Sequence, residues 1–248
     1  MRRRVALVAI VLVALLPGSA RAQLVDEHTR TEALLAFRAG EDFMSAQDFG
    51  NAAEQFIKAI AKDRLMLLAY FGLGQASMQR QLFPNAIQAF QGCLTVSREL
   101  YDLSRTHRVE VESARIDLIR EMEETLRRMQ EGKVKVSRLR IIQLEEEIAV
   151  LKRRKTPLES PYEPPAEVLL ALGSAYFRNG ERDDAETQWK AAVAVNPKLG
   201  DAHNNLAVIY MQTERYDLAE QEITLAEKSG FHVNPQFKDD LKKRRAGR

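Results

Sequence analysis

The feature that most constrains this fold is a set of residues that returns after thirty-four positions, in two separate halves of the chain. In the first half, small and aromatic residues occur as Gly40, Phe43, Ala52, Phe56 and Ala59 and again as Gly74, Ser77, Ala86, Phe90 and Cys93. In the second half, a pattern of large apolar, small and aromatic residues occurs as Leu172, Gly173, Tyr176, Ala185, Trp189 and Ala192 and again as Leu206, Ala207, Tyr210, Ala219, Ile223 and Ala226. A fixed period of this length is typical of stacked helical hairpins. We therefore predict an all-α chain that presents a surface to a partner.

Each unit is predicted to be two amphipathic helices joined by a tight turn, and the third unit shows this most fully. Its helices are expected over about 166–178 and 182–195. Gly180 lies between them, where a left-handed residue ends a helix at little cost, and Pro197 stops the second helix. Trp189 has alanines one turn away on either side, which leaves room for its ring between helices.

These residues resemble the tetratricopeptide-repeat superfamily. A unit of that family carries a large apolar residue, Leu-Gly and an aromatic residue, and then Ala, an aromatic residue, Ala and Pro. The third unit matches through Leu169, Leu172, Gly173, Tyr176, Ala185, Trp189, Ala192 and Pro197. The other units depart at single positions, such as Arg64 for the proline of the first unit and Ala207 for the glycine of the fourth. The resemblance implies a helical solenoid that binds proteins or peptides in its inner groove.

The predicted fold class is an all-α tetratricopeptide-repeat solenoid with a long-helix coiled-coil hairpin inserted between two repeat pairs. The N-terminal pair is expected over 23–100, with units at 33–66 and 67–100, and the C-terminal pair over 166–233, with units at 166–199 and 200–233. Residues 234–248 are expected to form a capping helix and basic tail that covers the last apolar face of the solenoid.

The stretch 101–155 lacks the repeat pattern and is rich in Glu, Arg and Lys. Its apolar residues predict two helices around Gly132, with seams formed by Ile116, Ile119, Met122, Leu126 and Met129 and by Val134, Ile141, Leu144, Ile148 and Leu151. We interpret this stretch as a coiled-coil hairpin, and two heavily degenerate repeats are the alternative. Four prolines in 156–165 then predict an extended linker and hinge.

The N-terminal segment 1–22 is predicted to be a secretory signal peptide. Three arginines precede an apolar run from Val5 to Leu16, and Ala20-Arg21-Ala22 forms a small-x-small cleavage site. The run is shorter than the roughly 20 apolar residues that a membrane-spanning helix needs. Cleavage after Ala22 is therefore expected, and an uncleaved anchor is the alternative.

The slight basicity of the chain comes from this export signal. Removing 1–22 takes away four arginines and no acids, so 33 basic and 35 acidic residues remain and the net charge falls from +2 to about −2. Such a balance argues against general nucleic-acid binding. Cys93, the only cysteine, occupies an alanine position of the repeat and is interpreted as a small buried residue.

No catalytic, cofactor or metal site is legible in the sequence. None of the four histidines has a histidine or cysteine at metal-ligand spacing, and no phosphate loop or nucleophile elbow occurs. The acidic run at Glu145 and the basic run Lys242-Lys243-Arg244-Arg245 are interpreted as solvated helix surface. We therefore predict that the chain is not an enzyme.

The resemblance places the inner groove on fixed columns of the first helix of each unit. These columns hold Leu34, Phe37, Glu41 and Met44, then Leu68, Phe71, Gln75 and Met78, then Leu170, Ser174 and Phe177, and finally Asn204, Val208 and Met211. The predicted partner-binding residues are Phe37, Met44, Phe71, Met78, Leu170, Phe177, Asn204, Asn205, Val208 and Met211.

This groove lacks the cations with which some family members clamp a C-terminal carboxylate. An apolar, methionine-containing groove instead suits an amphipathic helix or an extended apolar segment. Asn205 is expected either to hydrogen-bond a peptide backbone or to satisfy a neighbouring helix carbonyl. As an alternative for the whole groove, the chain's own coiled-coil arms cover it.

Together these features predict an exported, non-enzymatic scaffold that binds a protein or peptide with an apolar segment. The periplasm of a two-membrane bacterium is favoured over secretion, with no nucleic-acid partner and no stable membrane insertion after signal cleavage. The alternative is a structural spacer that forms a homo-oligomer through 101–155.

Overall fold

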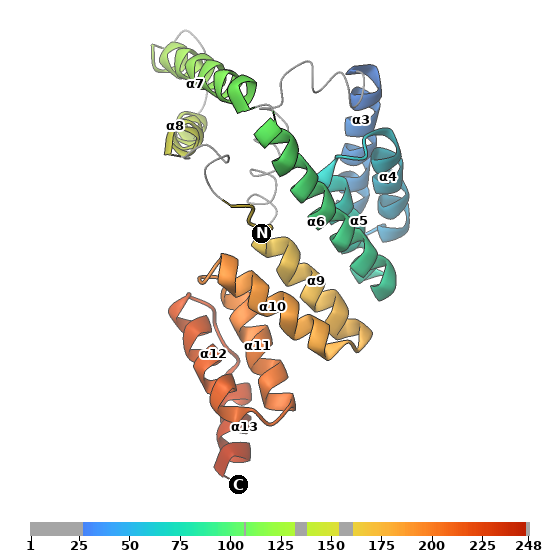
Figure 1. Cartoon of the computed structure of the whole chain (residues 1–248), viewed down its shortest axis with the longest axis vertical. Coiled ribbons are helices and arrows are strands. Elements are labelled where there is room, and N and C mark those ends of the chain that lie inside the picture. The colour runs from blue at the N-terminus through green and yellow to red at the C-terminus, as the bar shows by residue number, and fades with distance from the viewer. Residues whose placement is uncertain (1–26, 107, 132–137, 154–160, 247–248) are drawn as a thin grey trace.

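The computed structural model describes residues 27–106, 108–131, 138–153 and 161–246, and every regular element in these ranges is an α-helix (Figure 1). Consecutive helices pair into the hairpins α3 (Glu27–Ser45) with α4 (Phe49–Lys62), α5 (Leu67–Gln79) with α6 (Phe83–Thr106), α9 (Ala166–Asn179) with α10 (Arg182–Val195), and α11 (Gly200–Gln212) with α12 (Tyr216–Lys228). The prediction of an all-α helical solenoid is confirmed. The N-terminal segment 1–22 lies outside the described residues.

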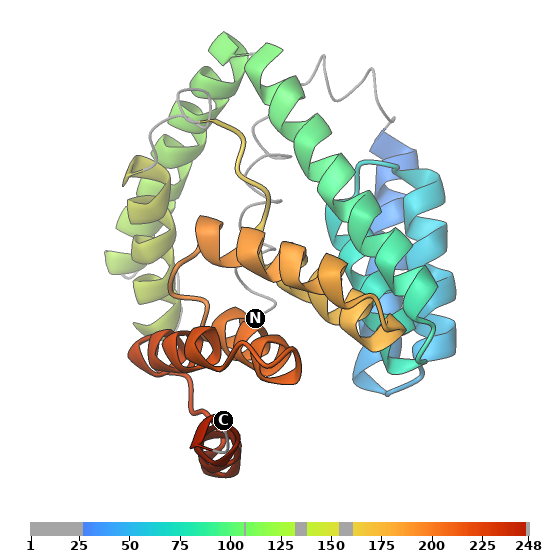
Figure 2. The same cartoon turned by 60° about the horizontal axis from the view of Figure 1, so that its bottom comes forward.

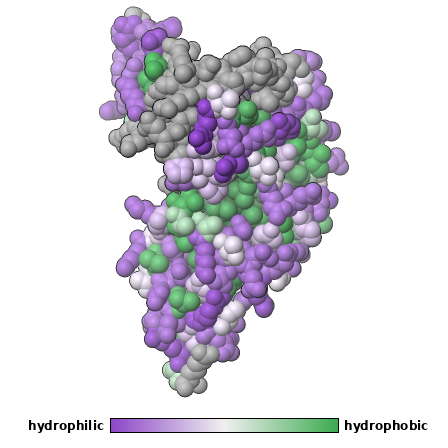
Figure 3. All heavy atoms as spheres, viewed as in Figure 1, coloured by the Kyte–Doolittle hydropathy of each residue, from purple (hydrophilic) through white to green (hydrophobic). Residues whose placement is uncertain are grey.

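The four hairpins form one continuous stack although an insertion separates the second from the third in sequence. Helix α9 packs directly against α6, and Val168, Leu172 and Ala175 join Phe90 and Cys93 in one buried cluster. The third unit therefore takes the place that an uninterrupted array would give it. Figure 3 shows hydrophobic side chains gathered across the middle of one face, near the meeting of α6 and α9.

Small residues on the first helix of a unit make room for a ring on the second. A Cβ atom added to Gly173 would lie 2.5 Å from Nε1 of Trp189, and one added to Gly40 would lie 2.6 Å from the ring of Phe56. The fourth unit has Ala207 and Ile223 at the equivalent positions. Alanine is larger than the glycine of the third unit, and isoleucine is smaller than its tryptophan, so the pair still fits. The fit between these two positions explains why the small and the large residue keep the same spacing in each unit.

The turn inside each hairpin is built in the same way. Its key residue has a positive φ, of 60° at Gln47, 59° at Gln81, 91° at Gly180 and 58° at Glu214. In each case the next residue donates its backbone N–H to a carbonyl five residues earlier, as Glu181 does to Tyr176 at 3.0 Å. Only the third unit places glycine there, so the other three turns hold a side chain in a conformation that glycine adopts more easily.

The insertion leaves and rejoins the stack at one place. The rings of Tyr101, on α6, and Tyr162, in the returning segment, have centroids 5.5 Å apart, and Arg98 lies over the ring of Tyr162 at 4.8 Å. The Tyr162 hydroxyl also donates to the carbonyl of Leu94 at 3.3 Å. Residues 161–165 are non-helical, and Tyr162 holds them against α6. Residues 156–160 lie outside the described residues, and the predicted hinge stays a prediction.

Helices α7 (Arg108–Gln130) and α8 (Arg138–Arg153) form the inserted arm, which extends away from α6 at an angle (Figure 2). The two helices pack on each other, with Leu144, Ile148 and Leu151 buried and an ion pair between Lys152 and Glu123. Ile116 of the predicted seam is 47% exposed, so the seam on α7 is only partly covered. Coiled-coil packing of the arm stays a prediction.

The C-terminal end of the stack is covered by α13 (Pro235–Ala246), which packs on α12. Leu241 is 4% exposed in the cluster that contains Ile223 and Ala226, and Phe237 is half-buried beside it. No helix in the described ranges combines the length and apolar character needed to cross a bilayer.

Candidate partner-binding groove

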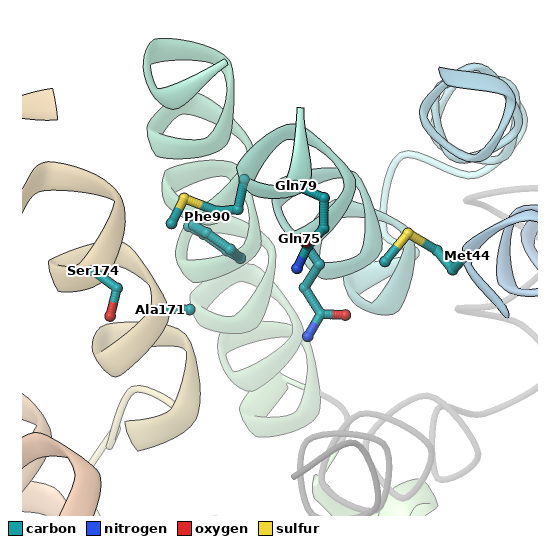
Figure 4. A pocket seen from close by; sticks show the side chains of 7 residues that line it. Met44, Gln75, Gln79, Phe90, Ala171 and Ser174 are labelled. Carbon is teal, nitrogen blue, oxygen red and sulfur yellow. The ribbon is translucent and has the colours of Figure 1, made fainter. Parts of the chain in front are cut away.

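The first helices of the first three units border a hollow of about 240 Å³ (Figure 4). Its lining comes from α3, α5, α6 and α9 and consists of Met44, Gln75, Met78, Gln79, Phe90, Ala171 and Ser174. In Figure 4 the side chains of Met44, Gln75 and Gln79 extend from α3 and α5 and Ser174 lies across from them on α9. The site therefore spans the junction between the two repeat pairs.

Repeat geometry explains this arrangement. Met44 and Met78 occupy equivalent positions at the ends of α3 and α5, and Gln75 and Ser174 are equivalent positions of α5 and α9. Because side chains three and four residues apart share a helix face, Gln75, Met78 and Gln79 lie together on α5. The hollow exists only because α9 stacks on α6 in register with the repeats.

The chemistry of the lining is neutral. Two thioethers, one ring and one methyl group supply apolar surface, and two side-chain amides and one hydroxyl supply polar groups. The Ser174 hydroxyl donates to the carbonyl of Leu170 at 2.9 Å, which leaves its oxygen available as an acceptor. Each amide offers both a donor and an acceptor, so the hollow matches a peptide backbone with uncharged side chains.

Two of the predicted partner-binding residues, Met44 and Met78, line this hollow, together with Gln75 and Ser174 of the predicted columns. Phe37 and Phe71 are half-buried and mainly support the core, with ring centroids 5.8 Å and 5.7 Å from Phe56 and Phe90. Since their rings brace the hairpins, substitutions there change stability as well as any surface.

The other predicted residues lie farther along the stack. Leu170 is 6% exposed and belongs to the core, where its carbonyl accepts a hydrogen bond from Nε1 of Trp189 at 3.1 Å. Phe177 packs with its ring centroid 5.7 Å from that of Trp189. Asn204, Asn205, Val208 and Met211 are half-buried on α11. None of these residues lines the hollow.

Sequence reasoning missed three lining residues. Gln79 follows Gln75 by one helical turn, which is a signal that could have identified it. Ala171 is small and adjoins Leu170 of the predicted column. Phe90 belongs to the recurring pattern of small and aromatic residues, and its ring also lines the hollow. A buried aromatic residue can thus form the floor of a surface site.

His203 and Cys93 take no part in this site. His203 is 4% exposed, with Nδ1 2.6 Å from a carboxylate oxygen of Glu222 and Nε2 3.0 Å from the carbonyl oxygen of Pro197. Burial raises the pKa of the Cys93 thiol, whose Sγ lies 3.6 Å from the carbonyl oxygen of Leu67. Among the residues that the structure describes, no group of three His, Cys, Asp or Glu side chains is arranged to hold a metal ion.

A profile of the tetratricopeptide repeat matches residues 37–95 and 170–230, which are the two repeat pairs described above. The chain is a tetratricopeptide-repeat protein. Tetratricopeptide repeats stack into solenoids with extended concave surfaces that bind proteins or peptides. The resemblance drawn from the sequence is thereby confirmed at the level of the superfamily.

Solved structures of other tetratricopeptide-repeat proteins resemble this one only distantly. PilW, a widely conserved type IV pilus biogenesis factor, has 13% identity and a TM-score of 0.40, with 86% of each chain covered. The pilF protein of Pseudomonas aeruginosa has 12% identity and a TM-score of 0.38, covering 85% of this chain and 82% of that one. YrrB, described as having an unusual peptide-binding site, has 19% identity and a TM-score of 0.31, covering 85% and 92%. No curated protein sequence matches this tetratricopeptide-repeat protein.

Proposed function

We propose that this chain is a non-enzymatic scaffold of the bacterial cell envelope that binds an apolar segment of a protein or peptide in its groove. The observation that carries the proposal is the neutral hollow between α3, α5 and α9, which Met44 and Met78 help to line. Thioether side chains adapt to irregular apolar surfaces, which suits a partner whose sequence varies.

The bound segment is expected to lie along the first helices of the stack. An apolar side chain enters the hollow above Phe90, while Gln75 and Gln79 hydrogen-bond the backbone of the segment. Asn204 and Asn205 extend the polar contacts along α11. Because the lining of the hollow carries no charge, the segment is internal to its protein rather than a C-terminal carboxylate.

Selection from a random peptide library on the chain starting at Gln23 tests this proposal. Recovered peptides should be enriched in apolar residues, and Met44→Lys with Met78→Lys should weaken their binding at least tenfold, because a lysine desolvated in an apolar hollow is costly. Leu225→Lys is the matched control, since Leu225 is 40% exposed on α12, away from the hollow. Equal binding by the two variants would refute the proposal.

Export to the periplasm is proposed from the basic, apolar and small-x-small parts of residues 1–22. Cell fractionation with intact-mass measurement provides the test, and the expected product begins at Gln23. Ala20→Arg with Ala22→Arg should block processing, because signal cleavage needs small residues at these positions. A product in the cytoplasm that retains Met1 would contradict the proposed route.

A structural spacer is the second candidate, and the arm favours it. Ile116 on α7 and Ile142 on α8 are 47% and 45% exposed, and exposed apolar side chains on the arm offer a surface through which two arms associate. Sedimentation of the mature chain and of a variant with Ile116→Lys and Ile142→Lys would test it. A sedimenting mass that is lower for the variant than for the mature chain supports the spacer. Equal masses for the two proteins exclude assembly through the arm.

A further inference from the structure

The outer face of the first helix is a stacking surface that no preceding hairpin covers in the described chain. Leu35 on this face of α3 is 59% exposed, the highest exposure among the large apolar residues described. Arg38 and Asp42 lie on the same face, since residues at i, i+3 and i+7 share one side of a helix, and both are exposed.

The positions of Leu35 and Asp42 are buried in every later unit. The equivalents of Leu35 are Ala69, Val168 and Ala202, and all three are 0% exposed. The equivalents of Asp42 are Ala76, Ala175 and Ile209, at 0%, 0% and 1%. Each of these residues faces the second helix of the preceding hairpin. The face of α3 is thus the one stacking surface, among the four units, that the described residues leave open.

The opposite end of the stack is closed. Helix α13 covers α12, with Leu241 buried in the core, so a second copy cannot continue the solenoid head to tail. An association through α3 therefore joins first unit to first unit, which gives a closed, two-fold symmetric pair rather than a filament.

The charges on the open face fit such a pair. In an antiparallel contact of two α3 helices about a two-fold axis near residue 40, Arg38 faces Asp42 of the partner subunit and the same pair forms again on the other side. Ala39 lies near the axis, where internal junctions have Leu73, Leu172 and Leu206, and its small side chain allows the helices to come close. The face is therefore complementary to itself.

We infer that the open face of α3 is a homodimer interface, in which Leu35 is buried and Arg38 and Asp42 form reciprocal ion pairs. The dimer joins two stacks through their first units and carries two grooves. A partner with two apolar segments, or two partners side by side, then binds with increased avidity.

The interface is small, because α3 has 19 residues and one helix pair covers less area than a standard protein interface. A dimer that dissociates in the micromolar range is expected. Sedimentation velocity of the mature chain from roughly 1 to 200 µM should therefore show a monomer–dimer equilibrium. A mass that stays monomeric across this range overturns the inference.

Charge reversal separates this contact from any other. Arg38→Asp leaves only acidic groups at the two positions, and Asp42→Arg leaves only basic ones, so each variant alone should dimerise at least tenfold more weakly. An equal mixture of the two should regain dimers, and the double variant Arg38→Asp, Asp42→Arg should dimerise like the parent. Unchanged dimerisation in both single variants, or a mixture that stays monomeric, would contradict the interface.

Two controls keep the test specific. Lys58→Glu reverses an exposed charge on α4 and should leave the dimer unchanged. Helicity measured by circular dichroism should be equal in all variants, because the substituted side chains are exposed. Binding of selected peptides by the monomeric variants should persist with one-to-one stoichiometry, so failure of the dimer and failure of the groove give different results.

Discussion

The repeat stack and the inserted arm use helices in different ways. In the stack, an alanine at one position of the second helix, Ala52, Ala86, Ala185 and Ala219, is 0% exposed in every unit. In the arm, the expected seam is unevenly covered, because Leu144 is 3% exposed and Ile116 is 47% exposed. Each hairpin of the stack depends on its neighbours, whereas the arm joins the stack at a single base. Nearest-neighbour packing thus allows a long insertion without loss of register.

The largest difference between the two regions should appear when a core ring is removed. Trp189→Ala should lower the free energy of unfolding by about 3–5 kcal/mol, because it leaves a cavity and deletes the hydrogen bond to the carbonyl of Leu170. Ile116→Ala, in the arm, serves for comparison. It should change the free energy of unfolding by less than about 0.5 kcal/mol. Urea unfolding followed by circular dichroism measures both. Equal losses would mean that the arm is part of the same core.

A second prediction concerns the fit between small and large residues. Gly173→Ala should destabilise the stack by about 1–2 kcal/mol, because its Cβ would meet Trp189 at 2.5 Å. Trp189→Ile should abolish this penalty for Gly173→Ala, since the fourth unit already pairs Ala207 with Ile223. A double-mutant cycle measures the coupling, expected at about 1 kcal/mol or more. Additive effects would contradict the pairing.

Substitutions at the positive-φ residue of each turn should change the stability of the stack less, with a sign that depends on whether the residue is a glycine. Gln47→Gly, Gln81→Gly and Glu214→Gly should each stabilise the stack by about 0.5–1 kcal/mol, because each residue has a positive φ that glycine adopts without strain. Gly180→Ala should destabilise it by a similar amount. Thermal unfolding of the four variants compares them. A loss of stability in the three glycine variants would show that their side chains make contacts that matter more than the strain.

Removal of the arm should have the smallest effect on the stack. Replacing 107–160 by about eight Gly and Ser residues keeps Tyr101 and Tyr162 in place, and their ring contact closes the base of the insertion. The unfolding free energy should then stay within about 0.5 kcal/mol, and Trp189 fluorescence should be unchanged. Unfolding of the third and fourth units in this variant would show that the arm organises the stack.

The fold of the stack was predictable because each position of the repeat occurs in several units of the sequence. Gly173, Trp189 and their counterparts show the same spacing in different units, so a departure such as Ala207 does not hide the pattern. The exit and return of the arm were not predictable, because the contact between Tyr101 and Tyr162 joins residues with no periodic relation. A pattern of proline residues indicated an extended segment at 161–165, but no local signal showed that it packs on α6.

The candidate site was predictable in part for a related reason. Met44 and Met78 could be placed on the groove from the resemblance, since they repeat at the family's spacing. The hollow also needs Ala171 and Ser174 of α9, and these reach it only through stacking across the insertion. Leu170 was expected to face the groove, yet it lies in the core beside Trp189. The place of a residue in a groove column therefore does not by itself decide whether its side chain lies on the surface or in the core.

The most direct measurement of the central claim, that the hollow is occupied by a partner, is site-specific photocrosslinking in intact cells. A photoreactive residue placed at Met78 should give a defined adduct with one or a few envelope proteins, and the same residue at Leu225 should not. Peptide mapping of the adduct should place the crosslink in an apolar internal segment of the partner. Adducts from Leu225 alone, or from Met78 only to the chain's own α7 and α8, would contradict the claim.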